Sequence, residues 1–337
     1  MGMHVRNRNI QQRMTNQLKK YNLVYNEATG LHDCNGDIEV NQDLVSPDGK
    51  FVVKFGVVKG DFECRHINLT SLEGAPKKVG GDFYCNDNEL TSLKGAPQEV
   101  GGSFYCGKNK LTSLTGAPQK VGKDFYCNDN ELTLLKGAPQ EVGGSFDCSY
   151  NKLTSLEGAP QIVGGDFDCK YNYLTTLKGA PKNVGGHFNC NDNRLITLEG
   201  VPQKVGGSFN CSYNKLTSLE RVPQKVNGYF NCSVNQLTTL EGAPQEVGKG
   251  FYCYENQLTS LKGSPQKVGG GFYCRENQLT TLEGAPQVVG GSFDCHANKL
   301  VFDETHFYGC LPDVIGGKLV AGKECNYEFA KDYYDNK

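Results

Sequence analysis

Cysteine carries the most reactive side chain in this sequence, and most of its 15 copies recur at one fixed interval. Thiols held in a row could ligate a soft metal or exchange disulfides. Neither chemistry has its usual signature, because there is no CxxC pair and successive cysteines of the row stand 21 residues apart. A column of small apolar side chains facing a core accounts for the spacing. The row comprises Cys64, Cys85, Cys106, Cys127, Cys148, Cys169, Cys190, Cys211, Cys232, Cys253, Cys274 and Cys295.

The thiols also indicate a compartment. A column of free cysteines is typical of a reducing environment, since neighbours at strand spacing would lie within disulfide reach if they were oxidised. No apolar run approaches the roughly 18 residues that a membrane helix needs, and no apolar stretch follows the charges at the N-terminus. We therefore expect a soluble, cytoplasmic protein with no membrane partner. Three cysteines lie outside the row and have no assigned role: Cys34, Cys310 and Cys325.

Other reactive side chains form no recognisable site. The six histidines are scattered, and none stands in a spacing typical of catalysis or metal binding. Rows of acidic residues could suggest calcium, but no DxDxDG loop is present. The 35 Lys and Arg are balanced by 37 Asp and Glu, so we expect no basic groove for nucleic acid. We expect no enzyme, no metal site and no cofactor.

A single internal repeat positions these residues. From Leu69 to Lys299 the chain reads as 11 units of 21 residues without an insertion, each of the form LTSLxGAPxxVGGxFxCxxNx. A unit of this length is too short to close a core of its own, so it must bury its apolar edge against its neighbours. The repeat therefore predicts a solenoid whose stability is shared by its coils.

One coil can be read from the segment GGSFYCGKNKLTSLTGAPQKV. Phe104 and Cys106 alternate with Tyr105, as in a short strand whose alternate side chains point inward. Leu111 and Leu114 re-enter the core, and the GAP segment forces an extended return because proline fixes φ and lacks a donor. A glycine pair then permits the bend into the next strand. We expect a β-solenoid with one parallel sheet of about 12 rungs and little helix.

The run FxCxxNxLTSL resembles the leucine-rich-repeat signature LxxLxLxxNxL, and GAPxxV is similar to the LPxxL step of short repeats in secreted effectors of enteric pathogens. The resemblance covers about two thirds of the chain and implies a repeat domain of this kind. Cysteine replaces the strand aliphatic, valine precedes phenylalanine by four residues rather than three, and no ubiquitin-ligase domain follows. The effectors' enzymatic activity is therefore not expected. The GAPQ and VGG motifs of the repeat also resemble repeats in reading frames of tailed phages, and this resemblance implies a phage origin.

The resemblance gives a role to an asparagine that occurs once in every unit. It implies that these amides bond the turn backbone of adjacent rungs, as a buried amide must do to avoid a desolvation cost. The row comprises Asn88, Asn109, Asn130, Asn151, Asn172, Asn193, Asn214, Asn235, Asn256, Asn277 and Asn298.

The segments outside the repeat are expected to cap it. Near the N-terminus, Ile10, Met14, Leu18 and Tyr21 share one helical face, which predicts a lid on the first rung or, alternatively, a docking helix. Near the C-terminus, a degenerate copy of PxxVGGxFxC follows Leu300. The expected boundaries are 1–22 for an amphipathic helix, 23–66 for a β cap, 67–300 for the leucine-rich-repeat solenoid and 301–337 for a C-terminal cap and tail.

With the scaffold positions fixed, recognition must lie in the outward residues of the strand face. These residues form blocks of tyrosine, aspartate and asparagine, and acids precede several of the phenylalanines. Tyrosine offers rigid contact area, and acidic neighbours attract a basic partner. Recent duplication of the repeat would also produce such blocks without a site. The candidate residues are Tyr84, Tyr105, Tyr126, Asp147, Asp168, Asn189, Asn210, Tyr252 and Tyr273 after the phenylalanines, and Asp82, Asp124 and Asp166 before them.

Our leading hypothesis is a non-enzymatic scaffold for protein–protein interaction, encoded by a phage, that sequesters or inhibits a host protein through this acidic, tyrosine-rich face. One alternative is a structural or assembly component of a virus particle, with the caps making the contacts. Another is a nucleic-acid mimic that blocks a DNA-binding enzyme. The sequence leaves the identity of the partner and the oligomeric state open.

Overall fold

The computed structural model describes residue 16, residues 19–303 and residues 305–321. These residues belong to two compact units, which divide between Gly165 and Asp166. We call the described residues up to 165 the N-terminal unit and those from 166 the C-terminal unit. Most of the helix expected within residues 1–22, the tail after residue 321 and Cys325 lie outside the described residues.

The N-terminal unit opens with a small irregular region. Strands β1 (Val24–Asn26) and β2 (Leu31–Cys34) form an antiparallel hairpin, and β2 pairs in parallel with β4 (Phe55–Val58). A 3₁₀ helix, η1 (Gln42–Leu44), lies between them in sequence. Every named strand pair that follows in this unit is parallel, as a coil that always turns in one direction requires.

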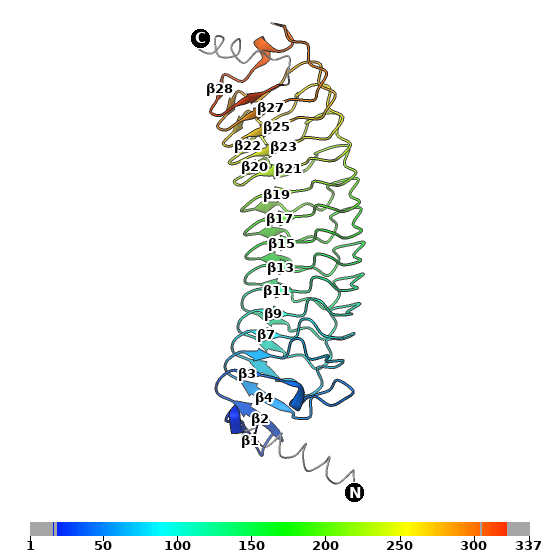
Figure 1. Cartoon of the computed structure of the whole chain (residues 1–337), viewed down its shortest axis with the longest axis vertical. Coiled ribbons are helices and arrows are strands. Elements are labelled where there is room, and N and C mark those ends of the chain that lie inside the picture. Colours follow the sequence, from blue (N-terminus) through cyan, green and yellow to red (C-terminus); the bar gives the residue numbers. More distant parts are fainter. Residues whose placement is uncertain (1–15, 17–18, 304, 322–337) are drawn as a thin grey trace. The chain divides into compact units, whose positions relative to one another are not determined.

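Each repeat of this unit supplies two strands of two residues. The first set, the phenylalanine row, pairs in the order β3 (Ile38–Glu39), β5 (Phe62–Glu63), β7 (Phe83–Tyr84), β9 (Phe104–Tyr105), β11 (Phe125–Tyr126) and β13 (Phe146–Asp147) (Figure 1). The second set, the valine row, continues from β4 through β6 (Lys78–Val79), β8 (Glu99–Val100), β10 (Lys120–Val121), β12 (Glu141–Val142) and β14 (Ile162–Val163). The expectation of one sheet was therefore wrong, because the segment around each valine forms a second parallel ladder.

The C-terminal unit repeats the same design. Its phenylalanine row runs through β15 (Phe167–Asp168), β17 (Phe188–Asn189), β19 (Phe209–Asn210), β21 (Phe230–Asn231), β23 (Phe251–Tyr252), β25 (Phe272–Tyr273), β27 (Phe293–Asp294) and β29 (Leu319–Val320). Its valine row comprises β16 (Asn183–Val184), β18 (Lys204–Val205), β20 (Lys225–Val226), β22 (Glu246–Val247), β24 (Lys267–Val268), β26 (Val288–Val289) and β28 (Val314–Ile315). A 3₁₀ helix, η2 (Tyr308–Cys310), precedes β28. The fold class predicted from the repeat is confirmed: both units are parallel β-solenoids.

The valine row of the C-terminal unit is interrupted between β18 and β20. The coil that supplies β20 has Arg221 and Asn227 where the preceding coil has Gly200 and Gly206. A Cβ at either of these glycines would overlap a backbone carbonyl of its neighbouring coil. Arg221 also has a φ of 77°, in the left-handed region that favours glycine. We attribute the interruption to these two side chains, which hold neighbouring backbones apart.

Stacked phenylalanines form the centre of the core. From Phe62 to Phe146, the rings of successive coils lie 5.3 or 5.4 Å apart, and these side chains are fully buried. The inward leucines and valines of the repeat are buried beside them. Each such side chain contributes roughly 1.5 to 3 kcal/mol by leaving water. Stability thus accumulates coil by coil, in proportion to the number of stacked repeats.

The cysteine row is part of this core. Its members are buried, and several thiols donate to a carbonyl of the next coil, as Cys127 Sγ does to Asp147 O at 3.3 Å. Cys190 Sγ makes the equivalent bond to Asn210 O at 3.3 Å. Burial raises the pKa of the Cys106 and Cys127 thiols well above the usual value, so the nucleophilic thiolate is suppressed. The predicted inward-facing column is confirmed.

The asparagine row ties the turns of adjacent coils together. Asn130 Nδ2 donates to Cys106 O and to Cys127 O, both at 3.1 Å, and Oδ1 accepts from Leu111 N at 2.9 Å. Asn235 in the C-terminal unit makes the same set of bonds with Cys211, Cys232 and Leu216. The resemblance therefore assigned this residue correctly.

Candidate functional site

The residue after each phenylalanine points away from the core, because side chains alternate along a strand. All the candidate residues, in the row after the phenylalanines and in the row before them, are partly exposed. The structure places them along the phenylalanine row of each unit (Figure 1, β7 to β13 and β15 to β25).

Three tyrosines of the N-terminal unit form one continuous stack. The rings of Tyr84 and Tyr105 are 4.6 Å apart and inclined by 6°, and those of Tyr105 and Tyr126 are 4.9 Å apart and inclined by 8°. The Tyr84 hydroxyl donates to Asp82 Oδ2 at 2.9 Å, and Arg65 lies over the Tyr84 ring at 5.4 Å. We call Tyr84, Tyr105 and Tyr126 the tyrosine stack. It offers a flat, rigid aromatic surface with polar hydroxyls.

The acids before the phenylalanines have a structural task that the sequence did not reveal. Asp82 Oδ1 accepts from Ser103 N at 2.7 Å, and Asp124 Oδ1 accepts from Ser145 N at 2.7 Å. In the C-terminal unit, Asp166 Oδ1 accepts from His187 N at 2.6 Å. Each carboxylate therefore caps an amide of the next coil. Since a carboxylate can accept further bonds, this task is compatible with a second one at the surface.

The carboxylates also affect the neighbouring phenols. Burial and the nearby Asp124 carboxylate raise the pKa of Tyr126 to about 12. Burial, the hydrogen bond to Asp82 and the charge of that carboxylate raise the pKa of Tyr84 well above its usual value. Both phenols thus stay neutral at physiological pH, where their hydroxyls can donate as well as accept.

The candidate residues at the start of the C-terminal unit are bonded among themselves. Asp168 Oδ2 pairs with Lys170 Nζ at 2.7 Å, and Asn189 Nδ2 donates to the same oxygen at 3.4 Å. Asn210 Oδ1 accepts from Ser212 N at 3.1 Å and from Ser212 Oγ at 2.7 Å. The acidic character of the face is therefore partly neutralised at Asp168.

Further along the C-terminal unit, the tyrosines surround a hollow. The rings of Tyr252 and Tyr273 are 4.8 Å apart and inclined by 3°, and Tyr229 meets Tyr252 edge-on at 6.2 Å. Glycines 250 and 271 stand where acids precede phenylalanine elsewhere, and a Cβ at Gly271 would lie 2.5 Å from the Tyr273 hydroxyl. We call this cavity of about 500 Å³ the tyrosine hollow; it is lined by Asn210, Tyr229, Asn231, Tyr252, Tyr254, Tyr273, Arg275 and Asp294.

The sequence reasoning missed two of these tyrosines. Tyr229 takes the place of an acid, serine or glycine before phenylalanine, and Tyr254 takes the place of a small or polar residue after cysteine. A comparison of the units position by position would have flagged both as departures from the repeat. Their convergence on one hollow required the structure, because they come from different rows.

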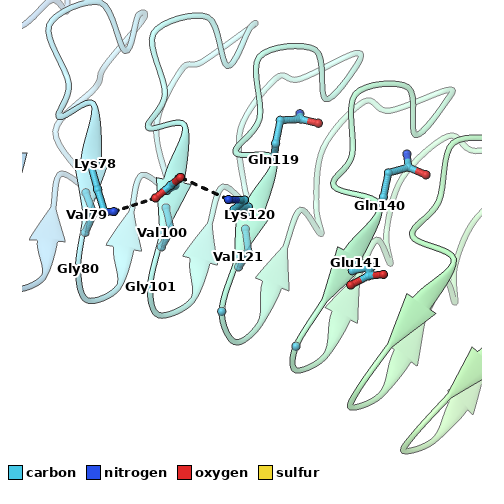
Figure 2. Close-up of a pocket in the computed structure, with 13 residues that line it drawn as sticks. Lys78, Val79, Gly80, Val100, Gly101, Gln119, Lys120, Val121, Gln140 and Glu141 are labelled. Atoms are coloured by element: carbon cyan, nitrogen blue, oxygen red, sulfur yellow. Dashed lines mark ion pairs between the residues drawn. The ribbon is translucent and has the colours of Figure 1, made fainter.

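A second cavity, of about 750 Å³, lies over the valine row of the N-terminal unit (Figure 2). Its rim alternates in charge: Glu99 pairs with Lys78 at 2.8 Å and with Lys120 at 3.7 Å. Glycines such as Gly80 and Gly101 line the cavity and present only backbone to it. The opposite charges in these ion pairs cancel, and each exposed pair contributes little to stability. This cavity therefore gives a poorer basis for recognition than the tyrosine-bearing face.

No group of three or more His, Cys, Asp or Glu side chains is arranged to hold a metal ion in the described part of the chain. None of the helices in that part is long and apolar enough to cross a membrane.

Parallel two-residue strands in 21-residue coils, buried leucines and an asparagine ladder at the turn define a leucine-rich-repeat β-solenoid. The solved structures to which this chain is similar include two of the protein YopM. YopM from Yersinia enterocolitica WA-314 is 21% identical, with a TM-score of 0.48, over 78% of this chain and 64% of that chain. YopM from Yersinia pestis, described as a leucine-rich effector protein, is 16% identical, with a TM-score of 0.47, over 85% of this chain and 88% of that chain.

The chain spans less than two thirds of the length of the first of these structures. No protein-family model matches the sequence, and no curated protein matches it.

Proposed function

We propose that this chain is a non-catalytic scaffold that binds and blocks a host protein through the tyrosine stack of its N-terminal unit. The observation that carries the proposal is the stack itself, three nearly parallel, partly exposed rings on consecutive coils. Aromatic rings that are already ordered lose little conformational entropy on binding and supply most of the energy at many interfaces. A surface of this kind suits a macromolecular partner better than a small substrate.

The charges beside the stack favour a partner with a basic surface. Asp82 and Asp124 flank the rings, and Asp147 follows them on β13. Arg65 lies over the Tyr84 ring but pairs with Glu63 at 2.6 Å, so it adds little net positive charge. Acidic groups around an aromatic surface speed the encounter with a basic partner and select against acidic ones.

The buried thiols and the sequence motifs of the repeat support the proposal that the protein acts in the host cytoplasm. Free cysteines stacked on successive coils persist in a reducing compartment. The resemblance of the GAPQ and VGG repeats to reading frames of tailed phages supports a phage origin and hence a bacterial host protein as the target.

The proposal can be tested by quantitative affinity capture from host lysate with the native chain and two variants. Tyr105→Ser/Tyr126→Ser removes two rings of the stack. Tyr150→Ser/Tyr213→Ser is a matched control, because these tyrosines are 45% and 49% exposed and lie outside the stack. We expect the stack variant to lose a specific partner by about tenfold or more, while the control retains it. A partner retained equally by both variants would contradict the proposal.

The charge can be tested without disturbing the backbone. Asp147 Oδ1 accepts from Ser149 N at 2.9 Å, and Asn210 makes the same bond with Ser212, so Asp147→Asn keeps the turn and removes the charge. We expect slower association and a smaller salt dependence with this variant. Competition by DNA for the captured partner would instead identify a nucleic-acid mimic, and stoichiometric presence in purified particles would identify a virion component.

A further inference from the structure

We infer that the tyrosine hollow of the C-terminal unit binds a neutral carbohydrate, at a site separate from the tyrosine stack. The inference goes beyond the proposed function and rests on three properties of the hollow: its aromatic walls, the fixed direction of its amides and its balanced charge.

The walls offer aromatic surface in two orientations. Tyr252 and Tyr273 are parallel, and Tyr229 stands at 85° to Tyr252. The aliphatic C–H faces of a sugar ring are apolar and slightly positive, so they pack on the negative face of an aromatic ring. Burial raises the pKa of Tyr229 and of Tyr252, which keeps their hydroxyls protonated as donors and acceptors for sugar hydroxyls.

The amides in the hollow can only donate to a ligand. Asn231 Oδ1 accepts from Ser233 N at 3.0 Å and from Ser233 Oγ at 2.7 Å, and Asn210 is held by Ser212 in the same way. A backbone N–H cannot accept, so these bonds fix which amide atom is the oxygen. The NH₂ groups of both residues, on the adjacent strands β19 and β21, have no partner among the described residues. They require acceptors, which sugar hydroxyl and ring oxygens supply.

The charge of the hollow favours a neutral ligand. Arg275 lies over the Tyr254 ring at 4.3 Å and pairs with Glu276. Asp294 Oδ1 is 2.6 Å from His296 Nδ1. The two charged residues that line the hollow are thus opposite in sign, and each already has a neighbour. A phosphate or a basic side chain would break one of these pairs, whereas a neutral carbohydrate can hydrogen-bond to both.

The size of the hollow agrees with this assignment. Its volume of about 500 Å³ lies within the range of roughly 300 to 1,000 Å³ typical of small-ligand sites. Such sites combine apolar or aromatic walls with a few polar groups that fix the orientation of the ligand, and the tyrosine hollow has both.

The experiment titrates the full chain with four neutral hexasaccharides: β-1,4-glucose, α-1,4-glucose, β-1,4-mannose and β-1,4-N-acetylglucosamine. Binding is followed by saturation-transfer NMR and by tyrosine fluorescence, which is unobscured because the chain has no tryptophan. Inorganic phosphate and N-acetyl-arginine amide serve as the charged probes. We expect at least one hexasaccharide to bind and neither charged probe to compete with it.

Two variants locate the site. Tyr252→Ser/Tyr273→Ser removes the parallel rings, and Asn210→Asp/Asn231→Asp removes the donors but keeps the turn, as Asp147 does with Ser149. Each is expected to weaken the sugar about tenfold or more, while Tyr105→Ser/Tyr126→Ser in the N-terminal unit leaves sugar affinity unchanged. The inference is overturned if none of the four sugars binds, if both hollow variants bind as the native chain does, or if a charged probe occupies the hollow instead.

Discussion

The tyrosine stack and the two parallel rings of the tyrosine hollow occupy the same position of the repeat, yet the stack is a flat surface and the hollow is a cavity. In the N-terminal unit Asp82 and Asp124 precede the phenylalanines of the coils that carry Tyr84 and Tyr126, with Ser103 on the coil between them. The Tyr84 hydroxyl donates to Asp82 Oδ2 at 2.9 Å. In the C-terminal unit Gly250 and Gly271 occupy that place, so the rings of Tyr252 and Tyr273 lie over bare backbone. We infer that the residue before the phenylalanine influences which surface the outward tyrosines form.

The core contacts of the repeat are constant between the two units, whereas the outward side chains vary. Phenylalanines, cysteines and asparagines make equivalent contacts in both units. The outward rows differ from coil to coil without any insertion between Leu69 and Lys299. A repeat scaffold of this kind can change its binding surface without changing its core.

The buried asparagine row is common to both units, and its substitution is expected to have the largest effect on stability. Asn130→Leu in the N-terminal unit and Asn235→Leu in the C-terminal unit each strand a buried leucine N–H. Each also removes one of the two amide donors to two cysteine carbonyls, which keep the donor from a neighbouring asparagine. Each change should lower the free energy of unfolding by about 3 kcal/mol, because the unpaired N–H keeps its desolvation cost and further hydrogen bonds are lost. Urea denaturation followed by circular dichroism measures both variants. A loss in only one of them would show that the two units do not share one scaffold.

Introducing two carboxylates should make the tyrosine hollow resemble the tyrosine stack. Gly250→Asp/Gly271→Asp places carboxylates where the N-terminal unit has them, next to Tyr252 and Tyr273. We expect the phenol rings to be displaced from the glycine positions and the hollow to lose sugar affinity by about tenfold, a change of about 1.4 kcal/mol. A titration with the hexasaccharide that the native chain binds measures the change. Unaltered affinity would mean that the residue before phenylalanine does not control the surface.

A smaller effect concerns the interruption in the valine row. Arg221→Gly removes a side chain from a left-handed backbone position, where φ is 77°. The C-terminal unit should gain about 1 kcal/mol, because the left-handed conformation costs a non-glycine residue about 1–2 kcal/mol and glycine returns part of this as chain entropy. Hydrogen exchange at the amides of β20 is expected to slow. Faster exchange there would refute our explanation of the interruption.

The smallest effect is a pH dependence in the tyrosine stack. The pKa of Tyr126 is about 12 in the folded chain, against about 10 in an unfolded one. Its contribution to stability is therefore fully present below pH 10 and is lost as the pH rises toward 12. Tyr126→Phe should lose less stability than the native chain between these pH values, as measured by urea denaturation. Identical pH profiles would argue against a raised pKa at this position.

The sequence predicted the coil well, because its information is periodic. Four apolar positions recur in every unit and are buried in each one, as are Phe104, Cys106, Leu111 and Leu114. The valine row was missed because two residues such as Lys120 and Val121 are too few to show an alternating pattern. Contacts between side chains of different rows were also missed, because the spacing of residues along the chain does not predict them.

The candidate site could be predicted only as a list of outward positions. That list held the tyrosine stack and three of the residues that line the hollow, Asn210, Tyr252 and Tyr273, because outward positions follow from the strand alternation. The capping bond from Asp124 to Ser145 N and the edge-on contact of Tyr229 with Tyr252 depend on how neighbouring coils are aligned. Both appear only when the coils are stacked.

We propose that the strand face of the N-terminal unit, rather than the ends of the chain, contacts a protein partner. Oxidative footprinting of the native chain, alone and in complex with its captured partner, tests this most directly. We predict that Tyr84, Tyr105 and Tyr126 become protected while Tyr150 and Tyr213 remain reactive. Protection confined to residues 19–58 or 301–321, with the tyrosine stack as reactive as in the free chain, would contradict the claim and favour an assembly role.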